Sequence, residues 1–507
     1  MTAGRPVPPD LPVPPDLAGP FDLAGSFDLA AVRRELAAAP GAGRLRPLGL
    51  RRVIDGEGAL AGLADAVAEL PRASDTVVVL AAATPMSVAA WDLRSVVQDA
   101  LRGRFPVEWV VVGPPAGDEP LHADARTVAA AAAAVARAGC VVTVGSGTIT
   151  DIGKAAAPQG TPLVAVQTAT SVNGYADPFS VLLRDGVKRT TPSRWPDVLV
   201  IDPAVLRAAP PDLNRAGVGD LMAMFTCSAD WYLAGAIADG CARDHRAAGA
   251  DPVYHAAVTG LTRARGGELL TLAARLDTDP GALAGLARIL TLSGIGMGVA
   301  GSTAPASGME HAVSHLLEMA ADARGEAASF HGIQVGVGSV VAAATWKQVR
   351  RAIAGGALER TARLPDPDDA RDRITGSFAA IDPTGAMAAE CFADYARKLR
   401  ALASAGDPLA SLRRSWAEHE AVLDTLLTGP DEVAAGLRSA GLPAGFGELP
   451  EPVSEAEARW AVASCMLMRQ RLSVADLAAL IGCWRDSDID AVLADAAASA
   501  AAAAGQP

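Results

Sequence analysis

Residues 140–154 read CVVTVGSGTITDIGK, and this stretch decides the fold. The run CVVTV is continuous and rich in β-branched residues, which is typical of a strand buried on both faces. Gly145 and Gly147 follow it at once and open a helical pattern. Glycine allows close approach of the backbone to an anion, and a helix N-terminus offers free N–H groups to it. The stretch predicts a strand–turn–helix unit, and either phosphate binding or a plain tight turn would explain its glycines.

The same stretch departs from two common phosphate-binding patterns. Thr150 stands where the dinucleotide pattern GxGxxG requires glycine. Ala155 follows Lys154 where the Walker A pattern requires serine or threonine. The motif alone therefore identifies no nucleotide.

Similar strand-like runs surround this unit, at residues 76–82, 107–113, 162–167 and 198–202. Helical patterns lie between them, and this alternation predicts a parallel, doubly wound sheet. After about residue 205 the strand-like runs stop and Ala/Leu-rich helical segments continue. We expect these at residues 216–239, 253–275, 281–300, 306–320, 331–355, 387–405, 408–427, 455–468 and 473–481. The fold class is therefore α/β plus all-α.

The chain is expected to divide into four parts. They are a disordered Pro-rich extension (1–45), a Rossmann-like sheet domain (46–210), a helical domain (211–490) and a frayed low-complexity tail (491–507). A length of 507 residues is ample for two cores.

Composition excludes several classes of function. The net charge of −13 and the lack of a basic cluster argue against nucleic acid as a partner. No CxxC pair occurs among the six cysteines, so we expect free thiols and a cytoplasmic protein. We also expect no membrane span and no signal peptide, because no sufficiently long uninterrupted apolar run is present.

Three of the seven histidines cluster within a short stretch. His311 and His315 are four residues apart, so they share one helix face, and His331 opens the next helical pattern. Asp220 lies in a Gly-rich segment, AGVGDL, and is the best candidate for a further ligand. An open Asp/His/His site would suit a Lewis-acid metal. On spacing alone, a structural histidine pair and a helix-capping aspartate explain the pattern equally well.

Four ordered motifs carry a family resemblance. They are GSGTITDIGK (145–154), QTATSVNGYADP (167–178), AGVGDL (216–221) and the pair SGMEHAVSH (307–315) with FHGIQVGVGS (330–339). The segment from Met468 to Leu477 also looks like the family's C-terminal end. In these residues the sequence resembles the iron-containing alcohol dehydrogenase superfamily. Within it, the sequence is most similar to the sn-glycerol-1-phosphate dehydrogenases. The likeness spans roughly residues 50 to 485.

The resemblance implies a dehydroquinate synthase-like fold and a set of site residues. Residues 46–210 would form the dinucleotide-binding domain and residues 211–490 the metal and substrate domain. The cofactor, NAD or NADP, would contact Gly145, Ser146, Gly147, Thr148, Ile149, Thr168, Ala169, Thr170, Ser171 and Asp177. One divalent metal would be held by Asp220, His311 and His331, with zinc favoured over iron or nickel. His315 and Asn173 would serve catalysis, His315 as a proton relay or as a group that holds the substrate.

The activity implied is interconversion of dihydroxyacetone phosphate and sn-glycerol 1-phosphate, or of a related polyol phosphate, by a homo-oligomeric enzyme. Lys188, Arg189 and Arg215 are candidate phosphate partners by charge alone, and surface charge is an equally good interpretation. Alternatives are a sugar-phosphate cyclase of the dehydroquinate synthase type and a non-catalytic binding protein on the same fold. Asp220 favours the dehydrogenase over the cyclase, which typically has Glu there.

Two departures from the family pattern bear on the substrate. Asn173 stands where the family usually has a substrate-contacting Asp, and Asn lacks both the charge and any function as a base. Asp177 stands where bacterial members often have Ser beside the cofactor. The exact polyol is therefore open.

Overall fold

The computed structural model describes residues 25–505 except 89, 114–120, 185, 239–252, 361 and 363. Cys241 and His245 lie outside the described residues, as does most of the Pro-rich N-terminal segment. The five cysteines within the described residues are free, as expected.

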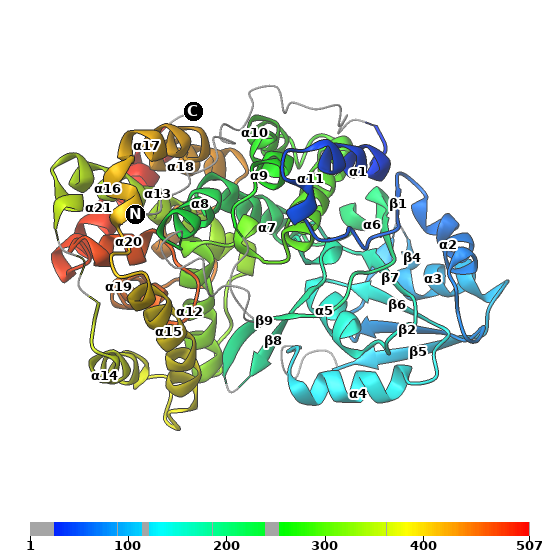
Figure 1. The fold of residues 1–507 in the computed structure, drawn as a ribbon. Helices are drawn as coiled ribbons and strands as arrows, with labels where there is room; N and C mark the ends of the chain where they lie inside the picture. The colour runs from blue at the N-terminus through cyan, green and yellow to red at the C-terminus, as the bar shows by residue number, and fades with distance from the viewer. Residues whose placement is uncertain are drawn as a thin grey trace.

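A six-stranded parallel sheet forms one half of the molecule (Figure 1). Its order is β1 (Arg52–Asp55), β10 (Val198–Ile201), β7 (Leu163–Gln167), β6 (Cys140–Gly145), β2 (Val77–Ala82) and β5 (Val107–Val112). All five expected strands are present, and β1 is an addition. The parallel, Rossmann-like prediction is confirmed.

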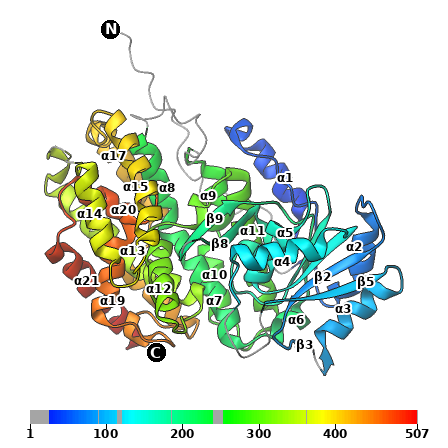
Figure 2. The same ribbon diagram turned by 90° about the horizontal axis from the view of Figure 1, so that it is seen from below.

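Helices cover both faces of this sheet (Figure 2). Val77, Val79 and Ala81 of β2 pack in one apolar cluster with α2 (Leu63–Glu69) and α3 (Leu93–Arg102). The alternate residues Val78 and Leu80 pack in a second cluster with α4 (Ala125–Val135) and α5 (Gly147–Ala156). Successive side chains of a strand point to opposite faces, so a continuous apolar run serves both layers.

An antiparallel hairpin of β8 (Phe179–Arg184) and β9 (Val187–Pro192) leaves the sheet half and reaches the helical half (Figure 1). Strand β8 lies against α4 and α5, whereas β9 lies against α12 and α15, whose bounds are given below. Neither this hairpin nor the short ribbon of β3 (Ser87–Val88) and β4 (Trp91–Asp92) was expected from the sequence. The hairpin joins the two halves close to the candidate site.

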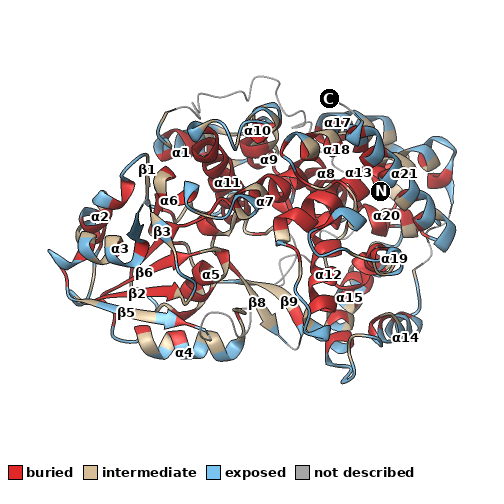
Figure 3. Ribbon diagram, turned by 180° about the vertical axis from the view of Figure 1, so that it is seen from behind, coloured by how far each residue is buried: buried red, intermediate tan, exposed pale blue. Residues whose placement is uncertain are grey.

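No strand follows β10 in the described part of the chain, which agrees with the expected all-α half. Its helices are α6 (Pro203–Arg207), α7 (Pro211–Met222), α8 (Cys227–Ala238), α9 (Ala256–Arg263), α10 (Gly266–Ala273), α11 (Pro280–Ala300), α12 (Met309–Arg324), α13 (His331–Ala354), α14 (Pro367–Phe378), α15 (Ala386–Ser404), α16 (Ala410–Arg414), α17 (Trp416–Leu426), α18 (Pro430–Ser439), α19 (Glu455–Ser464), α20 (Val474–Leu480) and α21 (Asp486–Ala504). Helices α6, α14 and α18 were not among the expected segments. Helices α11 and α13 are buried over most of their length (Figure 3).

Helix α11 is long and apolar enough to cross a membrane by length and composition alone. Its apolar window is fully buried inside the protein, so this helix forms the core of the helical half. A helix that is apolar on all sides is expected at such a position.

Both ends of the described chain differ from expectation. Helix α1 (Leu29–Ala38) forms within the segment expected to be disordered, because Asp28 caps it and Leu29, Val32 and Leu36 enter the core. At the other end α21 is helical rather than frayed. Alanine has the highest helix propensity, and the buried face of α21 packs on α13 and α18.

Candidate active site

The Gly-rich turn joins the end of β6 to the start of α5. Gly153 lies close to the strand, since a Cβ there would be 2.1 Å from Cγ2 of Thr143. Ser146 occupies the N-cap position, and its side chain makes no capping hydrogen bond. The first N–H groups of α5 are therefore not satisfied by this side chain, as an anion-binding helix N-terminus requires. Binding of a nucleotide phosphate to residues 145–149 stays a prediction.

Residues 168–171 follow β7 and are buried against α7. The backbone N–H of Thr170 donates to Oδ1 of Asn214 (2.9 Å), and the Thr170 hydroxyl donates to the Asn214 carbonyl (3.1 Å). A Cβ at Gly217 would lie 1.8 Å from the Thr170 carbonyl oxygen. These contacts fix the predicted cofactor segment, Thr168, Ala169, Thr170 and Ser171, onto the start of the helical half.

Asp177 lies in a buried ion cluster rather than on an open surface. Its Oδ1 is 3.0 Å from Nζ of Lys154, which is also 2.9 Å from Oδ1 of Asp151. The Phe179 N–H donates to the same Asp177 oxygen (2.7 Å). Burial raises the pKa of Asp177 to about 6 against the opposing effect of the Lys154 ammonium. The cluster fastens α5 to β8, and cofactor contact by Asp177 stays a prediction.

Asp220, His311 and His331 converge from three helices, α7, α12 and α13. Oδ1 of Asp220 lies 3.4 Å from Nε2 of His311 and 3.9 Å from Nε2 of His331. One ligand atom from each of the three residues lies within 4.8 Å of the other two. Asp220 and His311 are buried, whereas His331 is partly exposed. Two imidazole nitrogens and one carboxylate oxygen thus surround a point that a divalent cation could occupy.

Outer carboxylates orient both imidazoles. Nδ1 of His311 is 3.1 Å from Oε1 of Glu310, and Nδ1 of His331 is 3.2 Å from Oε1 of Glu318. Metal-binding histidines usually donate their second ring N–H to such a partner. Burial opposes ionisation of Glu318, but Lys188 and His331 hold its pKa at about 2. The donor set therefore fits a bound cation.

His315, Glu318 and His331 form a second group whose ligand atoms lie within 4.8 Å of one another. Here Glu318 already accepts from Nδ1 of His331 and pairs with Nζ of Lys188 at 3.0 Å. Because one Glu318 oxygen accepts a hydrogen bond from His331 and the other is ion-paired with Lys188, the Asp220 group is the better candidate for a metal.

Glycines let the three helices approach closely enough to bring these residues together. A Cβ at Gly332 would be 1.9 Å from the Ala216 carbonyl oxygen, and one at Gly219 would be 2.1 Å from the Gly332 carbonyl oxygen. A Cβ at Gly338 would be 2.8 Å from the carbonyl oxygen of Glu310. Larger residues would separate α13 from α7 and α12, and with them the candidate ligands.

His315 lies beside the trio of Asp220, His311 and His331, with its ring centroid 5.2 Å from that of His331. Its Nδ1 accepts a hydrogen bond from Nη2 of Arg469. Since arginine can only donate, the neutral His315 ring carries its proton on Nε2. Burial, and after it the Arg469 guanidinium, hold the pKa of His315 well below its usual range. His315 is thus built to donate a hydrogen bond in its neutral form.

Asn173 and Tyr175 connect the Gly-rich turn to the trio. The Asn173 backbone N–H donates to Oδ2 of Asp220 (3.2 Å), and its side-chain Nδ2 donates to Oγ of Ser293 (3.1 Å). Two residues later, the Tyr175 hydroxyl donates to the Gly145 carbonyl (3.2 Å). The predicted nucleotide and metal regions therefore lie next to each other.

The three cations chosen by charge have different surroundings. Lys188 pairs with Glu318 beside the trio, and Arg189 pairs with Glu390 (3.1 Å) and Asp394 (3.2 Å). Arg215 forms surface ion pairs with Asp212 and Asp277, which are 66% and 62% exposed. For Arg215 the surface-charge interpretation is therefore the better one.

Sequence reasoning missed Glu310, Glu318 and Arg469. Glu310 directly precedes His311, and Glu318 follows His311 by two helical turns, so a search of that helix face could have found Glu318. Arg469 lies in the segment that resembles the family's C-terminal end, but nothing in the sequence gives it a role in the site, because a loop before α20 brings it to His315.

The chain is similar to known proteins in both sequence and fold. The family model for iron-containing alcohol dehydrogenase matches residues 54–210. The chain is 34% identical over 314 residues to a glycerol-1-phosphate dehydrogenase of Thermofilum pendens, covering 60% of this chain and 82% of that protein. It is 30% identical over 310 residues to one of Methanothrix thermoacetophila, covering 60% and 80%.

The solved structure of glycerol dehydrogenase from Schizosaccharomyces pombe shares the fold, with a TM-score of 0.53 at 15% identity. The match covers 90% of this chain and 92% of that one. The sequence relatives show that the chain belongs to the glycerol-1-phosphate dehydrogenase family of iron-containing alcohol dehydrogenases, and that it is an alcohol-dehydrogenase-like enzyme.

Proposed function

We propose that this enzyme is a metal-dependent NAD(P)H oxidoreductase that interconverts dihydroxyacetone phosphate and sn-glycerol 1-phosphate, or a closely related polyol phosphate. The observation that carries the proposal is the convergence of Asp220, His311 and His331, each histidine backed by a carboxylate. The relatives named above as glycerol-1-phosphate dehydrogenases support this choice of substrate.

Asp220, His311 and His331 would hold one divalent ion, with zinc favoured over iron or nickel. A bound ion of this kind supplies Lewis-acid polarisation of the substrate oxygen. Glu310 and Glu318 keep the two Nε2 atoms directed at that point. Three protein ligands leave a coordination position for substrate.

His315 holds the substrate rather than acting as a proton relay. Its Nε2–H can donate to a substrate oxygen, while Arg469 occupies Nδ1 and disfavours the imidazolium. We assign it the positioning of the substrate next to the trio. The backbone N–H of Asn173 donates to Asp220, and its side-chain amide lies beside Ser293, where it can donate or accept a hydrogen bond but cannot act as a base.

The nicotinamide cofactor, NAD or NADP, would place its pyrophosphate on the turn of Gly145 to Ile149 and the start of α5. Asn173 and Tyr175 lie between this turn and Asp220, so cofactor and metal would face the same substrate. Transfer of hydride to the carbonyl carbon needs this arrangement.

The test is oxidation of NADH or NADPH with dihydroxyacetone phosphate after the purified protein is reconstituted with zinc, iron or nickel in turn. We expect substrate-dependent loss of absorbance of the reduced nicotinamide, abolished by a chelator. Consumption of the sugar phosphate with no net change in nicotinamide would instead indicate a cyclase and contradict the proposal.

We also propose a cytoplasmic homo-oligomer. The free cysteines within the described residues suit a reducing compartment. Light scattering of the purified protein measures the oligomeric state, and a mass of 51.5 kDa, that of one chain, would contradict it.

A further inference from the structure

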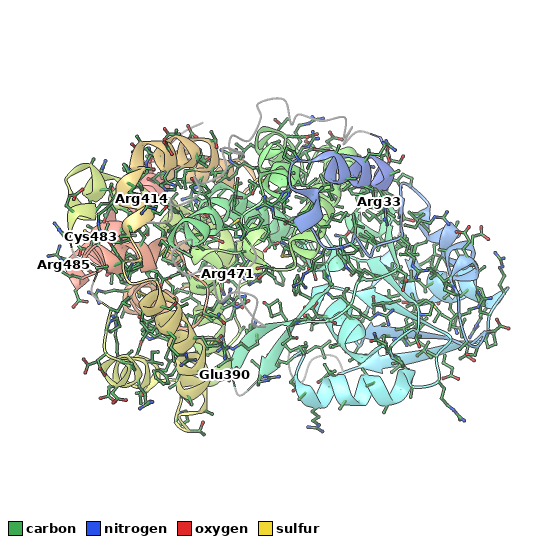
Figure 4. All side chains as sticks on the ribbon, viewed as in Figure 1. Arg33, Glu390, Arg414, Arg471, Cys483 and Arg485 are labelled. Atoms are coloured by element: carbon green, nitrogen blue, oxygen red, sulfur yellow. The ribbon has the colours of Figure 1, made fainter. Side chains whose placement is uncertain are left out.

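Two arginines lie beside the trio, on the loop between α19 and α20. Arg469 donates from Nη1 to Oγ of Ser307 (3.3 Å) and from Nη2 to Nδ1 of His315. Arg471 donates from Nη1 to the Ser307 carbonyl and from Nη2 to Oγ1 of Thr303 (2.6 Å). Both guanidiniums thus contact Ser307, so two positive charges lie next to each other. Figure 4 shows Arg471 at the boundary between the helical half and the β8–β9 hairpin.

The charge of Arg469 is not balanced by a direct ion pair. Among the residues that the structure describes, no carboxylate oxygen lies within ion-pair distance of its guanidinium, and its two hydrogen-bond acceptors are neutral. Burial, and after it repulsion from Arg471 and Arg189, lower the pKa of Arg469 to about 9, although the more distant carboxylates of Asp394 and Glu310 act in the opposite direction. A buried cation without a counter-ion is costly, and a bound anion would offset that cost.

Unlike Arg469, the neighbouring Lys188 and Arg189 have carboxylate partners. Lys188 pairs with Glu318, and Arg189 pairs with Glu390 and Asp394. Arg189 also donates from Nη1 to the carbonyl of Met468 (2.9 Å), which places it next to Arg469, while its buried Nη2 has no acceptor in the described structure. The region around Arg469 is therefore rich in hydrogen-bond donors, and the Arg469 guanidinium has no carboxylate within ion-pair distance among the described residues.

We propose that Arg469 and Arg471 form the subsite for the substrate's phosphate group, with Nη2 of Arg189 as an additional donor. This inference rests on the proposed function, because it assigns the phosphate end of the same substrate. Arg469 contacts His315, whose ring is 5.2 Å from that of His331, so the subsite lies one side chain away from the candidate metal. In dihydroxyacetone phosphate one carbon and one ester oxygen separate the carbonyl carbon from phosphorus, which suits this spacing. Guanidinium groups bind phosphate through paired, charge-assisted hydrogen bonds.

The subsite explains selectivity for a phosphorylated polyol over the free polyol. A neutral triose lacks the dianion that would balance the Arg469 guanidinium. Each charge-assisted hydrogen bond contributes on the order of 1.5–3 kcal/mol. Loss of one arginine should therefore raise the KM for the phosphorylated substrate by roughly 10- to 100-fold.

The test compares dihydroxyacetone phosphate with unphosphorylated dihydroxyacetone in Arg469→Gln, Arg471→Gln and the conservative Arg469→Lys. We expect both glutamine variants to raise the KM for the phosphate ester far more than that for the free triose, and Arg469→Lys to recover part of the loss. Isothermal titration with inorganic phosphate should show binding to the wild type and weaker binding to both glutamine variants. Arg350→Gln is the matched control, because Arg350 forms surface ion pairs with Glu420 and Asp424.

A purely structural role would have a different signature. Arg469→Gln could displace His315, which would impair both substrates equally, so equal losses in both glutamine variants overturn the inference. Unchanged phosphate binding overturns it as well. If Arg469→Gln does not fold, Arg471→Gln decides, since Arg471 donates to Ser307 and Thr303 and is not the residue that holds His315.

Failure of the proposed function is distinguishable. The wild type could bind inorganic phosphate through these arginines and still fail to oxidise NAD(P)H with dihydroxyacetone phosphate. That result supports the subsite and contradicts the proposed reaction. The opposite result is that the wild type reduces dihydroxyacetone phosphate and both glutamine variants have the same KM and phosphate affinity as the wild type. That result supports the proposed reaction and contradicts the phosphate subsite.

Discussion

The Gly-rich turn at 145–149 and the Asp220–His311–His331 trio are neighbours in space, yet they are built differently. The turn consists of consecutive residues that connect β6 to α5 and offers mainly backbone groups. The trio takes side chains from three helices, and their convergence depends on how closely α13 packs on α7 and α12. The turn should therefore be sensitive only to local changes, whereas the trio should also be sensitive to changes in helix packing away from the ligands.

The largest expected effect comes from the carboxylate of the trio. Asp220→Asn removes the one anionic ligand, and we expect a loss of bound metal and a fall in kcat/KM of roughly 10³-fold, since a Lewis-acid metal contributes several kcal/mol. Metal analysis and steady-state kinetics measure this. Asp212→Asn, on the same helix but exposed, is the control. Full activity of metal-free Asp220→Asn would show that catalysis does not require a metal bound by the trio.

The next largest effect should come from Gly332, which is not one of the candidate metal ligands. In Gly332→Ala the new Cβ would meet the Ala216 carbonyl, so α7 and α13 must move apart. We expect a loss of about 1–3 kcal/mol in the free energy of unfolding, together with weaker metal binding. Urea unfolding and competition with a chelator measure the two effects.

Gly376→Ala is the matched control for Gly332→Ala. Gly376 is exposed on α14, and a Cβ added there would meet no neighbouring atom within 4 Å, so alanine should stabilise the helix by about 0.5–1 kcal/mol. Unchanged metal affinity in Gly332→Ala would show that the trio tolerates looser packing than we infer.

The smallest effect should come from the turn. A Cβ at Gly145 would lie 2.7 Å from Cγ1 of Ile149, within the turn itself. We expect Gly145→Ala to raise the Kd for NAD(P)H about tenfold and to leave the metal content unchanged. Fluorescence titration measures the Kd, and Gly103→Ala, which has open space around it, is the control. Loss of metal in Gly145→Ala would mean that the two regions are not independent.

This contrast also explains which features the sequence reveals. The five expected strands are runs rich in β-branched residues, because both faces of the sheet are covered, and these runs stand out in the sequence. Strand β1 has the sequence RVID, with a charged residue at each end, and the β8–β9 hairpin is half-exposed and mixed in character, so neither stands out. The composition of α21 suggests a frayed tail, but its burial against α18 is a tertiary effect.

Candidate site residues divide in the same way. The Gly-rich turn is visible as a local motif, and Asp220, His311 and His331 were grouped mainly through family resemblance. Arg469 could not be found, because only the folded loop brings it to His315. Arg215 was a candidate by charge alone, and the ion pairs that occupy it are invisible in a sequence.

The most direct test is X-ray absorption spectroscopy of the purified protein reconstituted with zinc. We predict one ion per chain with two imidazole nitrogens and at least one carboxylate oxygen in its first coordination shell, and loss of this spectrum in Asp220→Asn. A protein that binds no zinc, or that binds it with the same spectrum in Asp220→Asn, would contradict the proposed site.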